Sequence, residues 1–316
     1  GPLVTKLSLC NFATPDTVRF AELLQRLAPE GCDHVLYCSG RDEMVDKGLR
    51  ALKYNNQSAQ CVLSLEGTYV GHTTAAARSV SDRDDGYFEW PKLPHPAEVG
   101  PAAALDALDA ARTEYGAENV LGLVLEAFGE RSGLAIPDAY YEGLEERRSD
   151  GLKVMLVETA TGGFRNGRGA CFLADTLPLN PDQVWYYPGG QLGLVFCADS
   201  AWVPKPLQLI STWDGDELSM IRVAHHLRWA WRNREAIGAK AGLLARILAG
   251  VSQASALGLA GFVGCDTAPV LSERLAALGV LVKTYDCGLG LMPALSIDAA
   301  ALGAALNEIR EAGAEA

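Results

Sequence analysis

The chain has 316 residues, of which 49% are hydrophobic and 21% charged, and its formal net charge is −12. This composition is typical of a globular protein of one or two domains. The acidic balance argues against nucleic acid and anionic membranes as partners, and no apolar run reaches the roughly 18 residues of a membrane span.

Eight cysteines are spread along the chain. None forms a CxxC pair, and none lies beside a histidine at metal-ligand spacing, so we expect no metal site. In a chain of this length, scattered cysteines are typical of buried, reduced thiols. They therefore predict a cytoplasmic protein.

The first two-thirds of the chain alternate helical and strand patterns. Helices are expected over residues 17–27, 43–54, 102–115 and 140–148, and strands over 34–38, 60–65, 120–125 and 153–157. Because these strands are continuously apolar and separated by helices, they predict a mostly parallel sheet that is covered by helices on both faces.

The pattern changes near residue 221. A long helix is expected over 225–249, strands over 258–263 and 279–284, and a closing amphipathic helix over 298–310. We therefore predict an α/β protein with a large domain at residues 1–220 and a small C-terminal α+β domain at residues 221–316.

Polar side chains gather where four of the predicted strands end. They are Ser39-Gly40-Arg41, the segment 66–73 with Tyr69 and His72, Glu126, and Glu158. Ligands bind beyond the carboxyl ends of such strands. The first group is a small-residue turn before a helix, which either presents backbone N–H groups to an anion or is an ordinary strand–helix connection.

Five segments carry a family resemblance. They are SGRDEM at 39–44, YVGHT at 69–73, VETATGGFR at 157–165, PDQV at 181–184 and STWDG at 211–215. Their order and spacing resemble the class III, pyridoxal-phosphate-dependent aminotransferases of fold type I, with the family's N-terminal segment largely absent. The resemblance implies that fold, a site at a dimer interface, and cofactor contacts from Ser39, Gly40, Arg41, Tyr69, Glu126 and Thr212.

The sequence departs from the family at the positions that carry the chemistry. The family's Schiff-base lysine falls at Pro188, and the aspartate that protonates the pyridine nitrogen falls at Val157. None of the eight lysines lies in the loop around Pro188. We therefore expect no internal aldimine and no cofactor, with noncovalent pyridoxal phosphate as the disfavoured alternative.

Arg41 replaces a serine that lies beside the phosphate in the family. We expect its guanidinium to pair with Asp42 or Glu43 and to fill the phosphate space. A substrate would then bind nearer Tyr69, Glu158 and Tyr187.

Three functions remain open on the sequence alone. The first is an enzyme that works without pyridoxal phosphate on a small amino- or carboxyl-bearing metabolite in a biosynthetic pathway, with Glu158, Tyr187 and His72 as catalytic groups. The second is a non-catalytic subunit that pairs with an active homologue. The third is an atypical aminotransferase that binds the cofactor through a substrate amine or another lysine. Each predicts a homodimer or a heteromer with a related subunit.

Overall fold

The computed structural model describes residues 13–314. Its larger part contains α1 (Pro15–Leu27), β1 (His34–Cys38), α2 (Arg41–Asn55), β2 (Cys61–Leu65), α3 (Ala75–Val80), β3 (Lys92–Leu93), α4 (Pro96–Val99), α5 (Pro101–Tyr115), β4 (Val120–Glu126), α6 (Asp138–Ser149), β5 (Val154–Val157), β6 (Gln183–Tyr186) and β7 (Gly193–Cys197). The smaller part contains α7 (Glu217–Arg232), α8 (Arg234–Leu248), β8 (Ala254–Leu257), β9 (Ala260–Gly264), α9 (Ala268–Ala277), β10 (Lys283–Tyr285), β11 (Gly288–Leu291) and α10 (Ala299–Ala314).

Seven strands form the large sheet, in the order β1-β7-β6-β5-β4-β2-β3. The strands from β6 to β3 pair in parallel, whereas β7 is antiparallel to both β6 and β1. The reversal at β7 is made by a tight turn in which Gly189 and Gly190 have φ of 85° and 73°, which glycine adopts without steric cost. The predicted α/β class with a mostly parallel sheet is confirmed.

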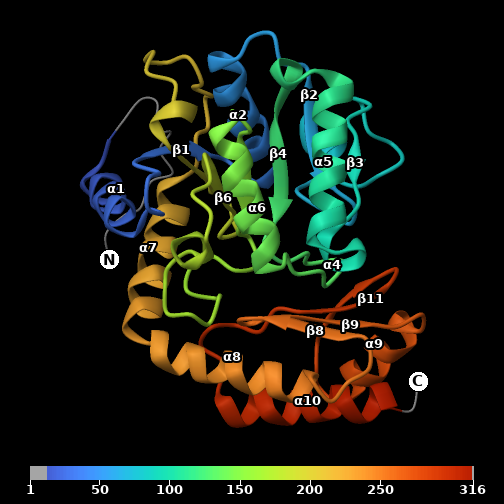
Figure 1. Cartoon of the computed structure of the whole chain (residues 1–316). Coiled ribbons are helices and arrows are strands. Elements are labelled where there is room, and N and C mark those ends of the chain that lie inside the picture. Colours follow the sequence, from blue (N-terminus) through green and yellow to red (C-terminus); the bar gives the residue numbers. More distant parts are fainter. Residues whose placement is uncertain (1–12, 315–316) are drawn as a thin grey trace.

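Helices cover both faces of this sheet, so its central strands are buried throughout (Figure 1). One face packs into the core that contains Trp185 and Met44 of α2, and the other into the core that contains Tyr140 and Tyr141 of α6. This double cover explains the uninterrupted apolar strands in the sequence.

The four-stranded sheet β10-β11-β9-β8 lies across from the carboxyl end of β4, with α8 and α10 beyond it (Figure 1). The loop after β4 touches this sheet directly: the carbonyl of Gly133 accepts a hydrogen bond of 2.6 Å from Ser255. A β-carbon on Gly133 would come within 2.6 Å of Phe262, so only glycine fits there. The carboxyl edge of the large sheet is therefore enclosed by the smaller part of the chain. The domain boundary at residue 220 falls inside α7 and stays a prediction.

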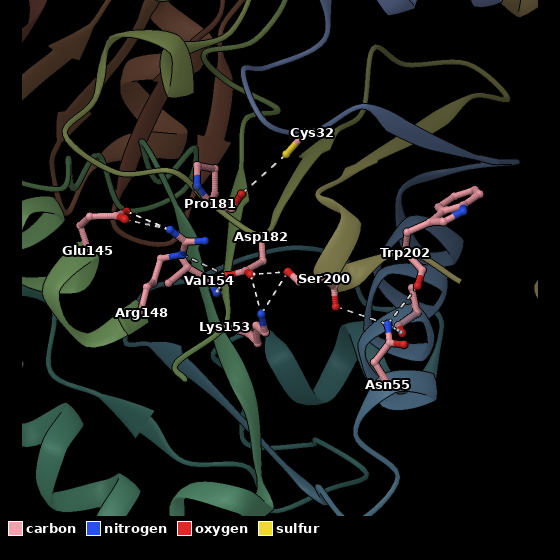
Figure 2. A network of polar contacts seen from close by, with 11 residues as sticks. Cys32, Asn55, Glu145, Arg148, Lys153, Val154, Pro181, Asp182, Ser200 and Trp202 are labelled. Carbon is pink, nitrogen blue, oxygen red and sulfur yellow. Dashed lines mark hydrogen bonds and ion pairs between the residues drawn. The ribbon is translucent and has the colours of Figure 1, made fainter. Parts of the chain in front are cut away.

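An acidic residue organises the opposite, amino-terminal edge of the sheet (Figure 2). Asp182 is 1% exposed and accepts hydrogen bonds from Arg148, Lys153, Ser200 and the backbone N–H of Val154, at 2.9 to 3.1 Å. These bonds join the starts of β5 and β6 to α6 and to the segment after β7. The network stabilises the frame at the edge remote from the candidate site.

Two global features of the described residues bear on the sequence-based expectations. Between residues 13 and 314, no helix is both long enough and apolar enough to cross a membrane. The same residues contain no group of three His, Cys, Asp or Glu side chains placed to hold a metal ion. The cytoplasmic location stays a prediction.

Candidate functional site at the carboxyl edge of the large sheet

Glu126 is the last residue of β4 and lies at the carboxyl edge of the sheet. Its side chain is 6% exposed and accepts a 2.7 Å hydrogen bond from the backbone N–H of Tyr69. Burial, followed by the nearby charge of Glu130, raises the pKa of Glu126 to about 8, and the bond from Tyr69 and the charge of Arg41 offset only part of this. At neutral pH the carboxyl group is mostly protonated.

Arg41, the first residue of α2, pairs with Glu130. Its two terminal nitrogens bond the Glu130 carboxylate at 2.7 and 3.2 Å, which is the bidentate geometry that guanidinium groups favour. The expected pairing of Arg41 with Asp42 or Glu43 is therefore wrong. Both carboxylates are engaged with backbone N–H groups instead: Asp42 accepts from His72 and Thr73 at 2.7 and 2.6 Å, and Glu43 from Ser39.

The backbone at Gly71 explains why Asp42 turns away from Arg41. Gly71 has φ of 142°, and a β-carbon there would lie 2.6 Å from the Asp42 carboxylate. Only glycine allows so close an approach. The carboxylate consequently fits against the 71–73 turn, and the guanidinium of Arg41 is left to Glu130.

Aromatic rings surround the two arginines of the site. The Arg41 guanidinium carbon lies 5.5 Å from the ring centroid of Tyr69 and 5.4 Å from that of Tyr187. The corresponding carbon of Arg131 lies 3.3 Å from Tyr69 and 5.5 Å from Tyr285. These are cation–π distances. We call Arg41, Tyr69, Glu126, Glu130, Arg131, Tyr187 and Tyr285 the arginine–tyrosine cluster.

Arg131 is the unbalanced charge of this cluster. Among residues 13–314 it has no ion pair within 4 Å, whereas Arg41 is neutralised by Glu130. Its Nε is buried and has no hydrogen-bond partner. With Glu126 mostly protonated, the cluster carries one excess positive charge, which favours an anion.

Sequence reasoning missed Glu130, Arg131 and Tyr285. The first two follow Glu126 by four and five residues, in the loop that leaves the end of β4. The same rule that singled out Glu126 could have found them, because this loop also lies at the carboxyl edge of the sheet. Tyr285 belongs to β10 of the small sheet, and no sequence signal brings it to this edge.

The predicted catalytic residues separate into two groups. His72 is exposed, and its Nδ1 lies 2.7 Å from the Tyr69 hydroxyl, while Tyr187 borders the cluster through Arg41. Glu158 is fully buried and accepts hydrogen bonds from Thr161, Leu173 and Ala174, all outside the cluster. Burial raises its pKa to about 7 despite these bonds. The placement of Glu158 favours a structural role.

The predicted cofactor-binding residues also differ in position. Ser39 and Gly40 precede α2, whose N-terminus has no side-chain cap, and a β-carbon on Gly40 would meet nothing within 4 Å. Space is therefore open next to Arg41. Thr212 is exposed in the connection before α7, where its neighbour Ser211 bonds Asp214 at 2.7 Å.

The lysine amines that have assigned partners are engaged outside the cluster. Lys47 donates to the carbonyl of Tyr37 and to the carboxylate of Asp214. Lys153 donates to the carboxylate of Asp182. The other three donate to backbone carbonyls: Lys53 to that of Ala59, Lys92 to that of Ser79 and Lys240 to that of Leu295. Lys205 and Lys283 are exposed, and Lys6 lies outside the described residues. Pro188 is half-buried in the turn between β6 and β7, and Val157 is buried at the end of β5.

The pH dependence of stability tests the buried state of Glu126. Its pKa rises from 4.5 to about 8 on folding, so the folded state holds a proton that the unfolded state has lost, and stability falls as the pH rises between these values. One pKa unit corresponds to about 1.4 kcal/mol, so the loss is on the order of a few kcal/mol. We expect Glu126→Gln to remove most of this decline in urea-unfolding curves. A decline unchanged from the wild type would contradict the assignment, and Glu142→Gln, at an exposed position, is the control.

No protein-family model matches the chain. Comparison with solved structures gives clear matches. A transaminase from the marine bacterium Virgibacillus superimposes with a TM-score of 0.87 at 20% identity, covering 99% of this chain and 81% of that one. An (S)-enantioselective omega-transaminase from Thermomicrobium roseum gives 0.85 at 19% identity, with coverage of 99% and 81%. The lysine aminotransferase from M. tuberculosis in the internal aldimine form gives 0.85 at 21% identity, with 98% and 81%.

The chain has the aminotransferase fold. This corrects one expectation from the sequence. The absence of a cofactor, inferred from Pro188 and Val157, is contradicted, because the three matched structures named above are transaminases or aminotransferases and one of them was solved in its internal aldimine form.

The cluster fits part of pyridoxal phosphate. An anionic group suits the N-terminus of α2, the guanidinium of Arg41 and the Nε of Arg131, which has no hydrogen-bond partner. A planar group suits the tyrosine rings. The assigned lysine partners do not place an amine in the cluster. The residues therefore suit the cofactor's phosphate and ring.

Proposed function

We propose that this protein is an atypical member of the aminotransferase fold that binds pyridoxal phosphate without joining it to a lysine. The cofactor lies in the arginine–tyrosine cluster, and the protein acts on a small metabolite that carries an amino or carboxyl group. When bound, the cofactor supplies an aldehyde that reacts with amines of such metabolites.

The observation that carries this proposal is the convergence of anion-binding groups beside Tyr69. The N-cap residue of the 15-residue helix α2, Gly40, has no side chain and open space beside it, Arg41 stands at the first position of the helix, and the Nε of Arg131 has no hydrogen-bond partner. Helix N-termini and guanidinium groups are the usual protein partners of phosphate.

The residues at the family's lysine and aspartate positions support the noncovalent part of the proposal. Pro188 stands where the resemblance puts the lysine, and its carbonyl faces the guanidinium of Arg222 at 3.5 Å. Val157, at the aspartate position, offers no charge to a pyridine nitrogen. The neighbouring carboxyl of Glu126 is mostly protonated and does not replace that charge.

A comparison of two ligands tests the proposal. Pyridoxal phosphate and pyridoxal differ only in the phosphate, so we expect the former to bind at least about 10-fold more tightly, which corresponds to a charge-assisted contact of about 1.4 kcal/mol. Quenching of tryptophan fluorescence during titration measures both affinities. Equal affinities would show that the cluster does not recognise the phosphate.

We also propose that two copies of the chain associate through the segment 202–214. Leu207 and Ile210 are 76% and 44% exposed, and they border a cavity of about 370 Å³ against β1. Leu207 has φ of 63°, a backbone conformation that residues other than glycine rarely adopt.

Sedimentation tests this association. We expect a dimer at micromolar concentration, with more than about 2,000 Å² buried, and monomers for Leu207→Glu and Ile210→Glu because each would bury a charge. Leu278→Glu, which changes a 59% exposed leucine after α9, is the matched control and stays dimeric. A monomeric wild-type chain would contradict the proposal, and recovery of a mixed complex from host extract would assign the surface to a related subunit.

A further inference from the structure

Two cysteines differ from the rest in their accessibility. Cys32, Cys38, Cys61, Cys171 and Cys197 are buried, whereas Cys265 is half-buried and Cys287 is exposed. Burial raises the pKa of Cys32 to about 12 and those of Cys171 and Cys197 well above the usual thiol value, so these thiols are inert. Of the described cysteines, only the pair in the small sheet is open to an oxidant.

The fold places these two residues opposite each other. Strands β9 and β11 are antiparallel, with Gly264 paired to Gly288, so the next step of the register pairs Cys265 with Cys287. The backbone confirms this step, because the N–H of Cys265 donates to the carbonyl of Cys287 at 3.1 Å. Hydrogen-bonded antiparallel pairs have Cα atoms about 5.5 Å apart, within the 4.4–6.8 Å that a disulfide requires.

We propose that Cys265 and Cys287 form a reversible disulfide, with a small disulfide such as glutathione disulfide as the oxidant. The exposed Cys287 sulfur attacks the oxidant, which forms a mixed disulfide and releases one glutathione thiol. Cys265 then attacks the Cys287 sulfur and releases the second glutathione. The protein loses two protons and two electrons, and the oxidant gains both.

This disulfide changes a contact to the arginine–tyrosine cluster. In the reduced protein, the Cys287 thiol donates to the carbonyl of Arg131 at 3.2 Å. A disulfide sulfur has no hydrogen to donate, so oxidation removes this bond from the loop between Gly129 and Gly133. Tyr285, whose ring lies near the Arg131 guanidinium, belongs to the same hairpin as Cys287. Oxidation therefore loosens the loop that carries Arg131.

Peptide mapping of the full-length protein tests this proposal. The chain is incubated with glutathione disulfide, its free thiols are alkylated, and it is digested with trypsin without reduction. Arg274 and Lys283 lie between the two cysteines, so trypsin places them on separate peptides. We expect these two peptides to be linked, the link to disappear with dithiothreitol, and Cys265→Ser to stop at a glutathione adduct on Cys287.

Hydrogen exchange supplies a second readout, which does not depend on the proposed function. The amides of residues 129–133 are expected to exchange about two- to fivefold faster after oxidation, because a thiol–carbonyl bond is weak. A glutathione adduct that persists on wild-type Cys287, or a link from Cys287 to Cys10 or to a second chain, would overturn the pairing. Unchanged exchange in the linked protein would overturn its effect on the loop.

Discussion

Replacing Arg41 by alanine is expected to weaken pyridoxal phosphate binding by roughly 10- to 100-fold. A hydrogen bond to a charged group contributes about 1.5–3 kcal/mol, and each 1.4 kcal/mol is a factor of ten in affinity. Arg41 stands at the N-terminus of α2, whose N-cap residue Gly40 supplies no side-chain cap. Fluorescence titration measures the loss, and binding of pyridoxal, which lacks the phosphate, is expected to change little.

Replacing Glu130, the ion-pair partner of Arg41, is expected to change the affinity for pyridoxal phosphate in the opposite direction. Glu130 holds the guanidinium through two hydrogen bonds and competes with any phosphate. Glu130→Gln removes the competing charge, so we expect it to tighten binding several-fold.

The control for Arg41→Ala is Arg19→Ala, which removes a positive charge at an exposed position of α1. If Arg41→Ala and Arg19→Ala bind the cofactor equally well, the phosphate does not lie beside α2.

Replacing Asp182 by alanine is expected to lower the free energy of unfolding by about 3 kcal/mol. The carboxylate lies at the centre of the network in Figure 2, and its removal leaves Arg148 and Lys153 without their shared buried counter-charge. Burial alone would raise the pKa of Asp182, but hydrogen bonds from these two residues outweigh it and lower the pKa. The stabilisation is therefore present above the unfolded pKa and is lost as the pH falls through the folded pKa.

Urea unfolding at neutral pH measures this effect. Ser200→Ala, which removes one hydrogen bond from the same carboxylate, is the matched control and is expected to cost about 1 kcal/mol. Equal losses for Asp182→Ala and Ser200→Ala would show that the ion pairs contribute nothing beyond a single hydrogen bond.

Local patterns predicted much of the large sheet. The expected strands 34–38, 60–65, 120–125 and 153–157 match β1, β2, β4 and β5 to within one residue at each end. Continuous apolar runs between helices indicate buried strands, as β2, β4 and β5 are, whereas β1 is a mostly half-buried edge strand that is antiparallel to β7. Strands β6 and β7 were missed. Their reversal depends on the Gly189-Gly190 turn, and no periodicity marks a four-residue strand beside such a turn.

The smaller part of the chain was predicted less well. One helix was expected over 225–249, but α7 and α8 are separate helices that meet at Asn233, whose side chain bonds the carbonyl of Trp229. Asparagine competes with helical hydrogen bonding in this way, yet a single asparagine in an apolar, alanine-rich run does not reveal a break. Strands β8 and β11 are four residues long, and their glycine and alanine content conceals them.

The candidate site was predicted in outline. Arg41, Tyr69, Glu126 and Tyr187 meet at the carboxyl edge because parallel strands bring their ends together there. The predicted pairing of Arg41 with Asp42 or Glu43 was wrong. The conformation of Gly71 lets the Asp42 carboxylate bond the backbone N–H groups of residues 72 and 73 instead. Local sequence cannot show which of three nearby carboxylates reaches a long guanidinium side chain.

Borohydride reduction in the presence of pyridoxal phosphate tests the central claim most directly. The protein is saturated with the cofactor, reduced, and analysed by intact mass and by peptide mapping. We expect the mass of the unmodified chain, because the lysine amines with assigned partners in residues 13–314 are engaged outside the arginine–tyrosine cluster. We also expect the cofactor to leave on dialysis. A stoichiometric cofactor adduct on one lysine would contradict the account and would identify that lysine as the internal aldimine.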